Sequence, residues 1–179
     1  MRVIAGEYRG RKLRTAEGVT TRPTSGRVRE ALFSSLGPLD GERVLDLFAG
    51  SGALGIESLS RGAEQALFVE TDRHALSALR GNLETLSLKP PRADVRAGEA
   101  IRSLQDLAKA GELYDLVFLD PPYDSVEMLA GQLARTVPPI LNAGARVVCE
   151  SSRRAALELP LPVTFQRRYG TTVITIHQT

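Results

Sequence analysis

The chain has 179 residues, enough for one ordinary domain that buries a core without disulfides or metal staples. Its single cysteine, Cys149, cannot form an internal disulfide, and His74 and His177 offer no cluster for zinc, so we expect no bound metal. The first residues run directly into charged sequence, and no apolar run is long enough to cross a bilayer. We therefore expect a monomeric cytoplasmic protein without a signal peptide or membrane contact.

The formal net charge is only +2, but basic residues gather at both ends of the chain. Residues 1–30 hold 8 Lys/Arg against 3 Asp/Glu, and residues 153–179 hold 4 against 1, so the middle of the chain is acidic. Basic ends suit the binding of an anionic polymer such as a nucleic acid. The alternative is that the many arginines reflect genomic base composition and solvated surfaces.

The N-terminal segment resembles a basic β-hairpin, because residues 2–5 and 11–15 flank a turn with two glycines. We assign residues 1–22 to this N-terminal arm and residues 23–179 to the main domain. The cations of the arm are candidate phosphate contacts: Arg9, Arg11, Lys12 and Arg14. They could instead form a charged edge that discourages strand pairing between molecules.

A first helix is predicted after the arm, because apolar residues recur at helical spacing over 28–36 and Thr24 or Ser25 can cap it. From residue 43 onward, strand-length apolar runs alternate with helical patterns, which indicates βαβ units and a parallel sheet. The predicted strands are 43–48, 65–70, 93–97, 114–119 and 145–150. Crossover helices are predicted over 75–86 and 101–108, and strands 163–168 and 172–177 form a closing hairpin around Gly170.

The segment Asp46 to Gly55 contains the pattern G-x-G-x-x-G where a strand ends and a helix begins. Such glycines bring backbone N–H groups close to a ligand at a helix N-terminus. Glu70 ends the next strand about 20 positions after Gly50, where an acidic side chain can bind a ribose diol. These features predict a cofactor that carries adenosine.

The chain length favours S-adenosylmethionine over NAD, since hydride-transfer enzymes ordinarily need a second domain for the substrate. Glu99 follows the third strand and can accept a hydrogen bond from the adenine amine. It can equally be an acidic first-turn residue that stabilises its own helix.

The buried fourth strand ends in Asp120-Pro121-Pro122-Tyr123, and in a doubly wound sheet this strand lies beside the first. Asp120 and the glycine loop should therefore open into the same crevice. An exocyclic base amine is a poor nucleophile, because its lone pair is delocalised into the ring. Asp120 and the Pro121 carbonyl can accept its two N–H bonds, the prolines stiffen the turn, and Tyr123 can stack on the base.

These motifs together resemble the RsmD family, the bacterial 16S ribosomal RNA guanine-N2 methyltransferases within the class I methyltransferases. The resemblance covers nearly the whole chain, from Gly6-x-x-Arg9-Gly10-Arg11-Lys12-Leu13 and Arg22-Pro23-Thr24 through Asp120 to Tyr123. It implies a Rossmann-like, mainly parallel seven-stranded sheet with helices on both faces and an N-terminal β-hairpin arm. It also implies methylation of a guanine N2 in 16S rRNA of the 30S subunit, with S-adenosylmethionine as donor.

The resemblance also implies roles for individual residues. Asp120, Pro121, Pro122 and Tyr123 would form the catalytic site, although the family often has Phe where this chain has Tyr123. The cofactor would contact Thr24, Arg27, Asp46, Phe48, Gly50, Ser51, Gly52, Glu70, Glu99 and Ala100.

Two other functions share parts of this pattern. A DNA adenine or cytosine amino-methyltransferase has the same catalytic motif but ordinarily carries a sizeable target-recognition region. A non-catalytic RNA-binding assembly factor could keep the fold, but the complete Asp120 to Tyr123 motif beside an intact glycine loop argues against it. A dinucleotide oxidoreductase ranks last.

Overall fold

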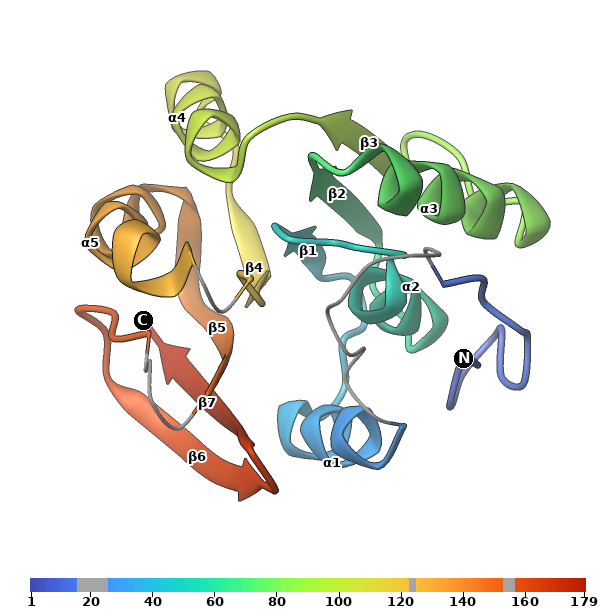
Figure 1. The fold of residues 1–179 in the computed structure, drawn as a ribbon, viewed down its shortest axis with the longest axis horizontal. Helices are drawn as coiled ribbons and strands as arrows, with labels where there is room; N and C mark the ends of the chain where they lie inside the picture. The colour runs from blue at the N-terminus through green and yellow to red at the C-terminus, as the bar shows by residue number, and fades with distance from the viewer. Residues whose placement is uncertain (16–25, 123–124, 153–156) are drawn as a thin grey trace.

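The structure, a computed structural model, describes residues 1–15, 26–122, 125–152 and 157–179 (Figure 1). Seven strands form one sheet in the order β3-β2-β1-β4-β5-β7-β6. The strands are β1 (Arg43–Asp46), β2 (Gln65–Glu70), β3 (Ala93–Ala97), β4 (Tyr114–Leu119), β5 (Leu141–Ser152), β6 (Val163–Tyr169) and β7 (Thr172–Gln178). The helices are α1 (Gly26–Leu36), α2 (Ala53–Ser60), α3 (Arg73–Thr85), α4 (Ala100–Ala110), α5 (Val126–Thr136) and a 3₁₀ turn η2 (Pro138–Ile140). None of the helices described is long and apolar enough to cross a membrane.

The sheet is parallel from β3 to β5 and ends in two antiparallel pairings, β5 with β7 and β7 with β6. β1 lies between β2 and β4, so the order reverses at β1, where the predicted fold placed the ligand crevice. The predicted Rossmann-like fold is confirmed, with a mostly parallel seven-stranded sheet and an antiparallel end.

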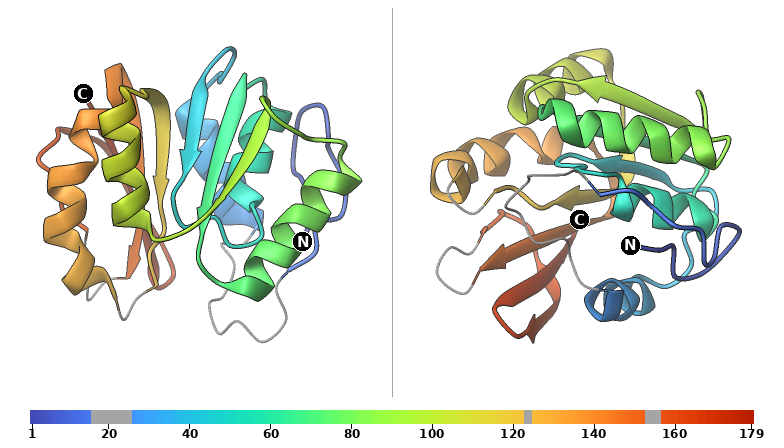
Figure 2. Two further views of the ribbon diagram at one scale, coloured as in Figure 1. Left: turned by 90° about the horizontal axis from the view of Figure 1, so that it is seen from above. Right: turned by 45° about the vertical axis from the view of Figure 1, so that its right-hand side comes forward.

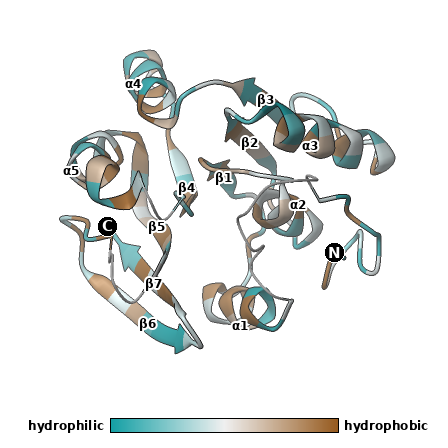
Figure 3. Cartoon of the chain, viewed as in Figure 1, coloured by the Kyte–Doolittle hydropathy of each residue, from teal (hydrophilic) through white to brown (hydrophobic). Residues whose placement is uncertain are grey.

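Side chains of the central strands alternate between two hydrophobic clusters. Val44 and Phe118 pack in the cluster that contains residues of α1, α2 and α3. Leu45 and Val117 point the other way, into the cluster that contains residues of α4 and α5. Helices α3, α4 and α5 carry both brown and teal in Figure 3, as amphipathic helices that cover a sheet should. Both faces of the central strands are therefore buried, which leaves the strand ends for function.

Most predicted elements agree with the structure, and β2, β3 and β4 have the predicted bounds. β1 stops at Asp46 rather than residue 48, because the chain already turns at Leu47 and Phe48. β5 is longer than predicted, and α5 was not predicted. In α5, Val126 and Leu133 are buried. The helical pattern is weak in the sequence, because the apolar stretch is short and is interrupted by Gly131.

The N-terminal arm packs against α2 and α3 (Figure 2). The predicted hairpin is reduced to one antiparallel bridge, Arg2 with Lys12, and Val3 and Leu13 are buried in the core. Backbone bonds still join the two segments, from the Val3 N–H to the Arg11 carbonyl at 3.0 Å and from the Leu13 N–H to the Met1 carbonyl at 3.0 Å. The predicted arm boundary at residue 22 lies outside the described residues.

Glu57 and Ser60 on α2 hold the arm. The fully buried Glu57 carboxylate accepts the backbone N–H groups of Ile4 at 2.8 Å and Ala5 at 3.1 Å. The Ser60 hydroxyl accepts the N–H of Tyr8 at 2.9 Å. Gly6 has φ of 80°, and a Cβ there would lie 1.6 Å from the Ser60 carbonyl oxygen, so the close approach requires glycine.

Glu57→Ala should detach the arm, because two buried N–H groups and Arg61 would lose their acceptor. We expect the free energy of unfolding to fall by roughly 2–3 kcal/mol. Urea titration would measure the loss, with the exposed Glu64→Ala as control. Equal stability of the two variants would contradict the role of Glu57.

Candidate functional site

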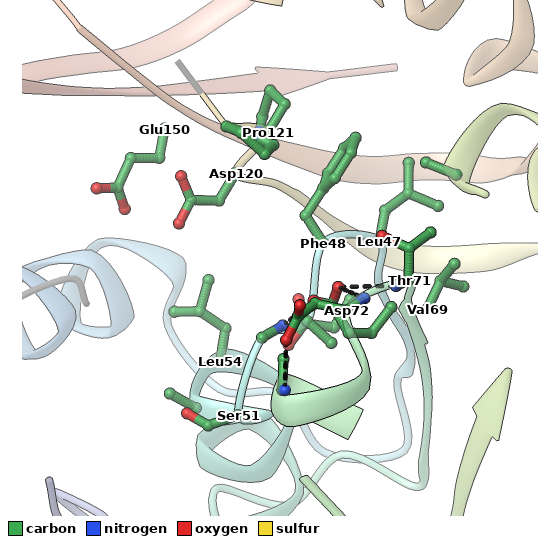
Figure 4. Close-up of a pocket in the computed structure, with 18 of the residues that line it drawn as sticks. Leu47, Phe48, Ser51, Leu54, Val69, Thr71, Asp72, Asp120, Pro121 and Glu150 are labelled. Atoms are coloured by element: carbon green, nitrogen blue, oxygen red, sulfur yellow. Dashed lines mark hydrogen bonds between the residues drawn. The ribbon is translucent and has the colours of Figure 1, made fainter. Parts of the chain in front are cut away.

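The carboxyl ends of β1, β2, β4 and β5 surround a cavity of about 590 Å³. The glycine loop after β1 lies on one side of this cavity, and Asp120-Pro121-Pro122 after β4 lies on the other (Figure 4). The structure thus brings together the two motifs that the sequence placed 70 residues apart. Tyr123 and Thr24 lie outside the described residues.

The glycine loop is shaped by close packing. α2 begins after Gly52, which has φ of 84°, a conformation that favours glycine. At Gly55, a Cβ would lie 2.3 Å from the Phe68 ring on β2. The last glycine of the motif therefore lets the helix approach the sheet, as the sequence pattern predicts.

Asp46, the last residue of β1, fixes the start of α2, because its carboxyl group accepts the Gly55 N–H at 2.9 Å. Its side chain is deeply buried, and the residue is only 2% exposed. Burial raises the pKa of Asp46 to about 7; the bond from Gly55 opposes this shift and the nearby Glu70 adds to it. Asp46 is thus a partly protonated group near neutral pH.

Glu70 organises the neighbouring turns. Its carboxylate accepts N–H groups from Gly50 at 2.7 Å, Thr71 at 2.7 Å and Asp72 at 2.8 Å. A carboxylate offers about four acceptor positions, so capacity remains for a ligand donor. Glu70 lines the cavity as predicted, and it also ties the glycine loop to the end of β2.

Of the other predicted cofactor residues, four line the cavity and Arg27 does not. Phe48, Ser51, Glu99 and Ala100 line the cavity, with Glu99 at the N-cap of α4 but without a side-chain capping bond. Arg27 is exposed and does not line it.

Arg29, on the same helix as Arg27, lies at the cavity instead and is 3% exposed. Its Nη2 donates to the Arg2 carbonyl at 2.7 Å, while Nε and Nη1 have no partner within the described residues. Burial lowers the pKa of Arg29, and the nearby Glu57 opposes this shift. The sequence carried a signal, because Arg29 falls on the same helical face as Leu32, Phe33 and Leu36.

Asp120 lies at the carboxyl end of β4 beside Glu150, which sequence reasoning missed (Figure 4). Burial, then the charges of Glu150 and Asp46, raise the pKa of Asp120 well above its ordinary value. Glu150 lies within β5, two residues before the strand ends, and its place beside Asp120 comes from the register of β5 with β4. No group of three His, Cys, Asp or Glu in the described part of the chain is arranged to hold a metal ion.

The arm and the glycine loop meet at Asn82 on α3. Its side-chain amide donates to the carbonyls of Arg14 at 3.0 Å and Ser51 at 2.9 Å, and its oxygen accepts the Arg14 N–H at 2.7 Å. The four predicted phosphate contacts of the arm, Arg9, Arg11, Lys12 and Arg14, are all exposed. Arg11 also donates to the Thr85 carbonyl at 3.0 Å.

The raised pKa of Asp46 should make stability depend on pH. Native Asp46 keeps a proton up to about pH 7, whereas the unfolded chain releases it near 3.8. As the pH rises between these values, the unfolding free energy of the wild type relative to Asp46→Asn should therefore fall, by up to roughly 1.4 kcal/mol per pH unit. Urea titrations of both proteins across this range test it. A constant difference would show that Asp46 has no raised pKa.

The comparisons with known proteins agree with this architecture. The family model described as "Conserved hypothetical protein 95" matches residues 1–178. A Bacillus subtilis (strain 168) protein named "Putative rRNA methyltransferase YlbH" is 40% identical over 184 residues, covering 99% of this chain and 98% of that protein. Ribosomal RNA small subunit methyltransferase D of Escherichia coli (strain K12) is 44% identical over 128 residues, covering 69% of this chain and 60% of that protein.

A solved structure of a hypothetical protein from Thermus thermophilus has a TM-score of 0.83 and 31% identity, covering 100% of this chain and 99% of that one. The predicted resemblance to RsmD is confirmed by these matches along the chain. The chain therefore belongs to the family described as Conserved hypothetical protein 95.

Proposed function

We propose that this protein transfers a methyl group from S-adenosylmethionine to the exocyclic N2 amine of a guanine in 16S rRNA. One observation carries the proposal: Asp120-Pro121-Pro122 opens into the same cavity as the glycine loop and Glu70. The names of the relatives in Bacillus subtilis and Escherichia coli support rRNA as the substrate class.

The cavity fits the cofactor in size and chemistry. Its volume of about 590 Å³ lies within the ordinary range for small-molecule sites. Glu70 is positioned to accept a bond from a ribose hydroxyl, and the glycine loop lies at the N-terminus of α2. Arg29 adds a positive charge at the wall, which favours the carboxylate of the methionine moiety.

S-adenosylmethionine supplies an electrophilic methyl group bonded to a sulfonium. Asp120 and the Pro121 carbonyl accept the two N–H bonds of the amine, which favours the pyramidal nitrogen and directs its lone pair toward that methyl group. Asp120, buried and with a raised pKa, is then suited to take the proton that the nitrogen loses. Tyr123, the next residue of the motif after Pro122, is assigned to stack on the base.

Substrate choice is tested by incubating the protein with tritiated S-adenosylmethionine and 30S particles, free 16S rRNA or DNA. We expect label in N2-methylguanosine from an RNA substrate. Label in DNA would identify an amino-methyltransferase of the DNA class, and cofactor binding without any transfer would identify an assembly factor.

Asp120→Ala should reduce kcat/KM by at least about 100-fold, because the amine would lose a preorganised acceptor. Cofactor affinity, measured by calorimetry with S-adenosylhomocysteine, should stay near that of the wild type. Asp106→Ala, an exposed substitution on α4, controls for the loss of a carboxylate. Loss of cofactor binding together with activity would assign Asp120 to the cofactor instead.

Replacing Arg9, Arg11 and Arg14 together with Ala should weaken RNA binding and flatten its salt dependence. Each lost phosphate contact should change the log-log slope by about 0.7 for single-stranded RNA, or roughly 2 for three contacts. Arg102, Lys109 and Arg135 on α4 and α5 give a triple Ala control with the same change in charge. An unaltered slope in a monodisperse arm variant would leave the arm as a charged edge that prevents association.

A further inference from the structure

Glu150 is the cross-strand neighbour of the catalytic carboxylate. Leu119 of β4 and Cys149 of β5 are paired in parallel register, so Asp120 and Glu150 are the next residues on adjacent strands. Adjacent strands lie about 4.8 Å apart, and Figure 4 shows the side chains of Asp120 and Glu150 as neighbours. Both residues line the cavity, so one ligand edge can meet both.

Glu150 lies on the side of the cavity that receives the base. The adenosine side is organised by Glu70, which binds the glycine loop, and by Asp46, which accepts from Gly55. Figure 4 shows Glu150 beside Asp120 and Pro121, apart from Thr71 and Asp72 at the end of β2. Glu150 is therefore not placed to hold the ribose or the adenine of the cofactor.

The environment of Glu150 suits direct contact with a hydrogen-bond donor. Glu150 is 6% exposed, so a ligand that reaches it is largely removed from water. Its charge contributes to the raised pKa of Asp120, which shows that the two carboxyl groups interact electrostatically. Two acidic groups in one buried corner favour a ligand edge that presents donors, because each carboxylate offers about four acceptor positions.

The three amine-bearing bases differ in the ring nitrogen of the Watson–Crick edge next to the amine: N1 in guanine and adenine, and N3 in cytosine. In guanine, N1 carries a hydrogen and donates, so N1–H and the 2-amine form a continuous row of donors. In adenine and cytosine, the ring nitrogen beside the amine has a lone pair and accepts. A carboxylate that faces this position pairs with guanine, whereas it meets another acceptor in the other two bases.

We propose that Glu150 determines specificity for guanine by accepting the N1–H hydrogen bond while Asp120 and the Pro121 carbonyl hold the 2-amine. This inference rests on the proposed guanine-N2 activity. Glu150 contributes an acceptor that selects the base, and the 2-amine itself is bound without it. The same corner disfavours adenine and cytosine, whose amines are otherwise suitable substrates.

The test compares guanine with 2-aminopurine, which keeps the 2-amine but has an acceptor at N1. The methylated guanine is first located with the wild type and tritiated S-adenosylmethionine. 16S rRNA with 2-aminopurine at that position is then made by splinted ligation and assembled into 30S particles. We expect the wild type to prefer guanine by roughly 10- to 100-fold in kcat/KM.

Glu150→Gln should lower this preference at least about tenfold, since the amide of Gln can accept from N1–H or donate to the N1 lone pair. Glu64→Gln makes the same chemical change at the amino end of β2, away from the cavity, and should keep the wild-type ratio. Thermal unfolding and S-adenosylhomocysteine affinity establish that the Gln variant folds and binds the cofactor.

Each outcome decides a separate point. If the wild type methylates both bases equally, Glu150 does not select guanine, and this result needs no variant. If Glu150→Gln slows both substrates by the same factor, the residue is structural and the proposal is overturned. If the wild type transfers no methyl group to any guanine N2, the proposed function itself fails, which the first labelling step reveals before Glu150 is tested.

Discussion

The parallel pairing of β1 with both β2 and β4 is the constraint on which the candidate site depends. It places the carboxyl ends of the three strands side by side, although their residues are far apart in the sequence. Asp46, Glu70 and Asp120 meet at the cavity for this reason alone. A change of strand order would leave each motif intact and separate their side chains.

The carboxyl ends of these strands bring several acidic side chains together, and burial disfavours their charged forms. Asp46 keeps its proton to about pH 7, whereas the Glu70 carboxylate is stabilised by three backbone N–H donors. These different solutions give the cavity one side that holds the glycine loop and another side, around Asp120 and Glu150, that attracts hydrogen-bond donors. The polarity of the site thus follows from where the strands place their acidic residues around the cavity.

The sequence predicted most of the fold, because glycine, proline and apolar periodicity act locally. It identified the glycine loop and the Asp120 motif, which the structure brings to one cavity. It did not identify Arg29, which donates to the Arg2 carbonyl of the arm, or Glu57, which accepts backbone N–H groups of the arm. Glu150 was missed because its importance comes from register with β4, which is a tertiary property.

Helix α2 has only eight residues, yet its first turn follows the glycine loop and its later residues, Glu57 and Ser60, hold the arm. Segments that share so short a helix open as one cooperative unit rather than fraying separately. Asn82 reinforces this unit by bonding to both Arg14 and Ser51. Amide hydrogens of the arm and of the loop should therefore exchange with solvent at a common free energy of opening, so a ligand that orders one segment slows exchange in the other.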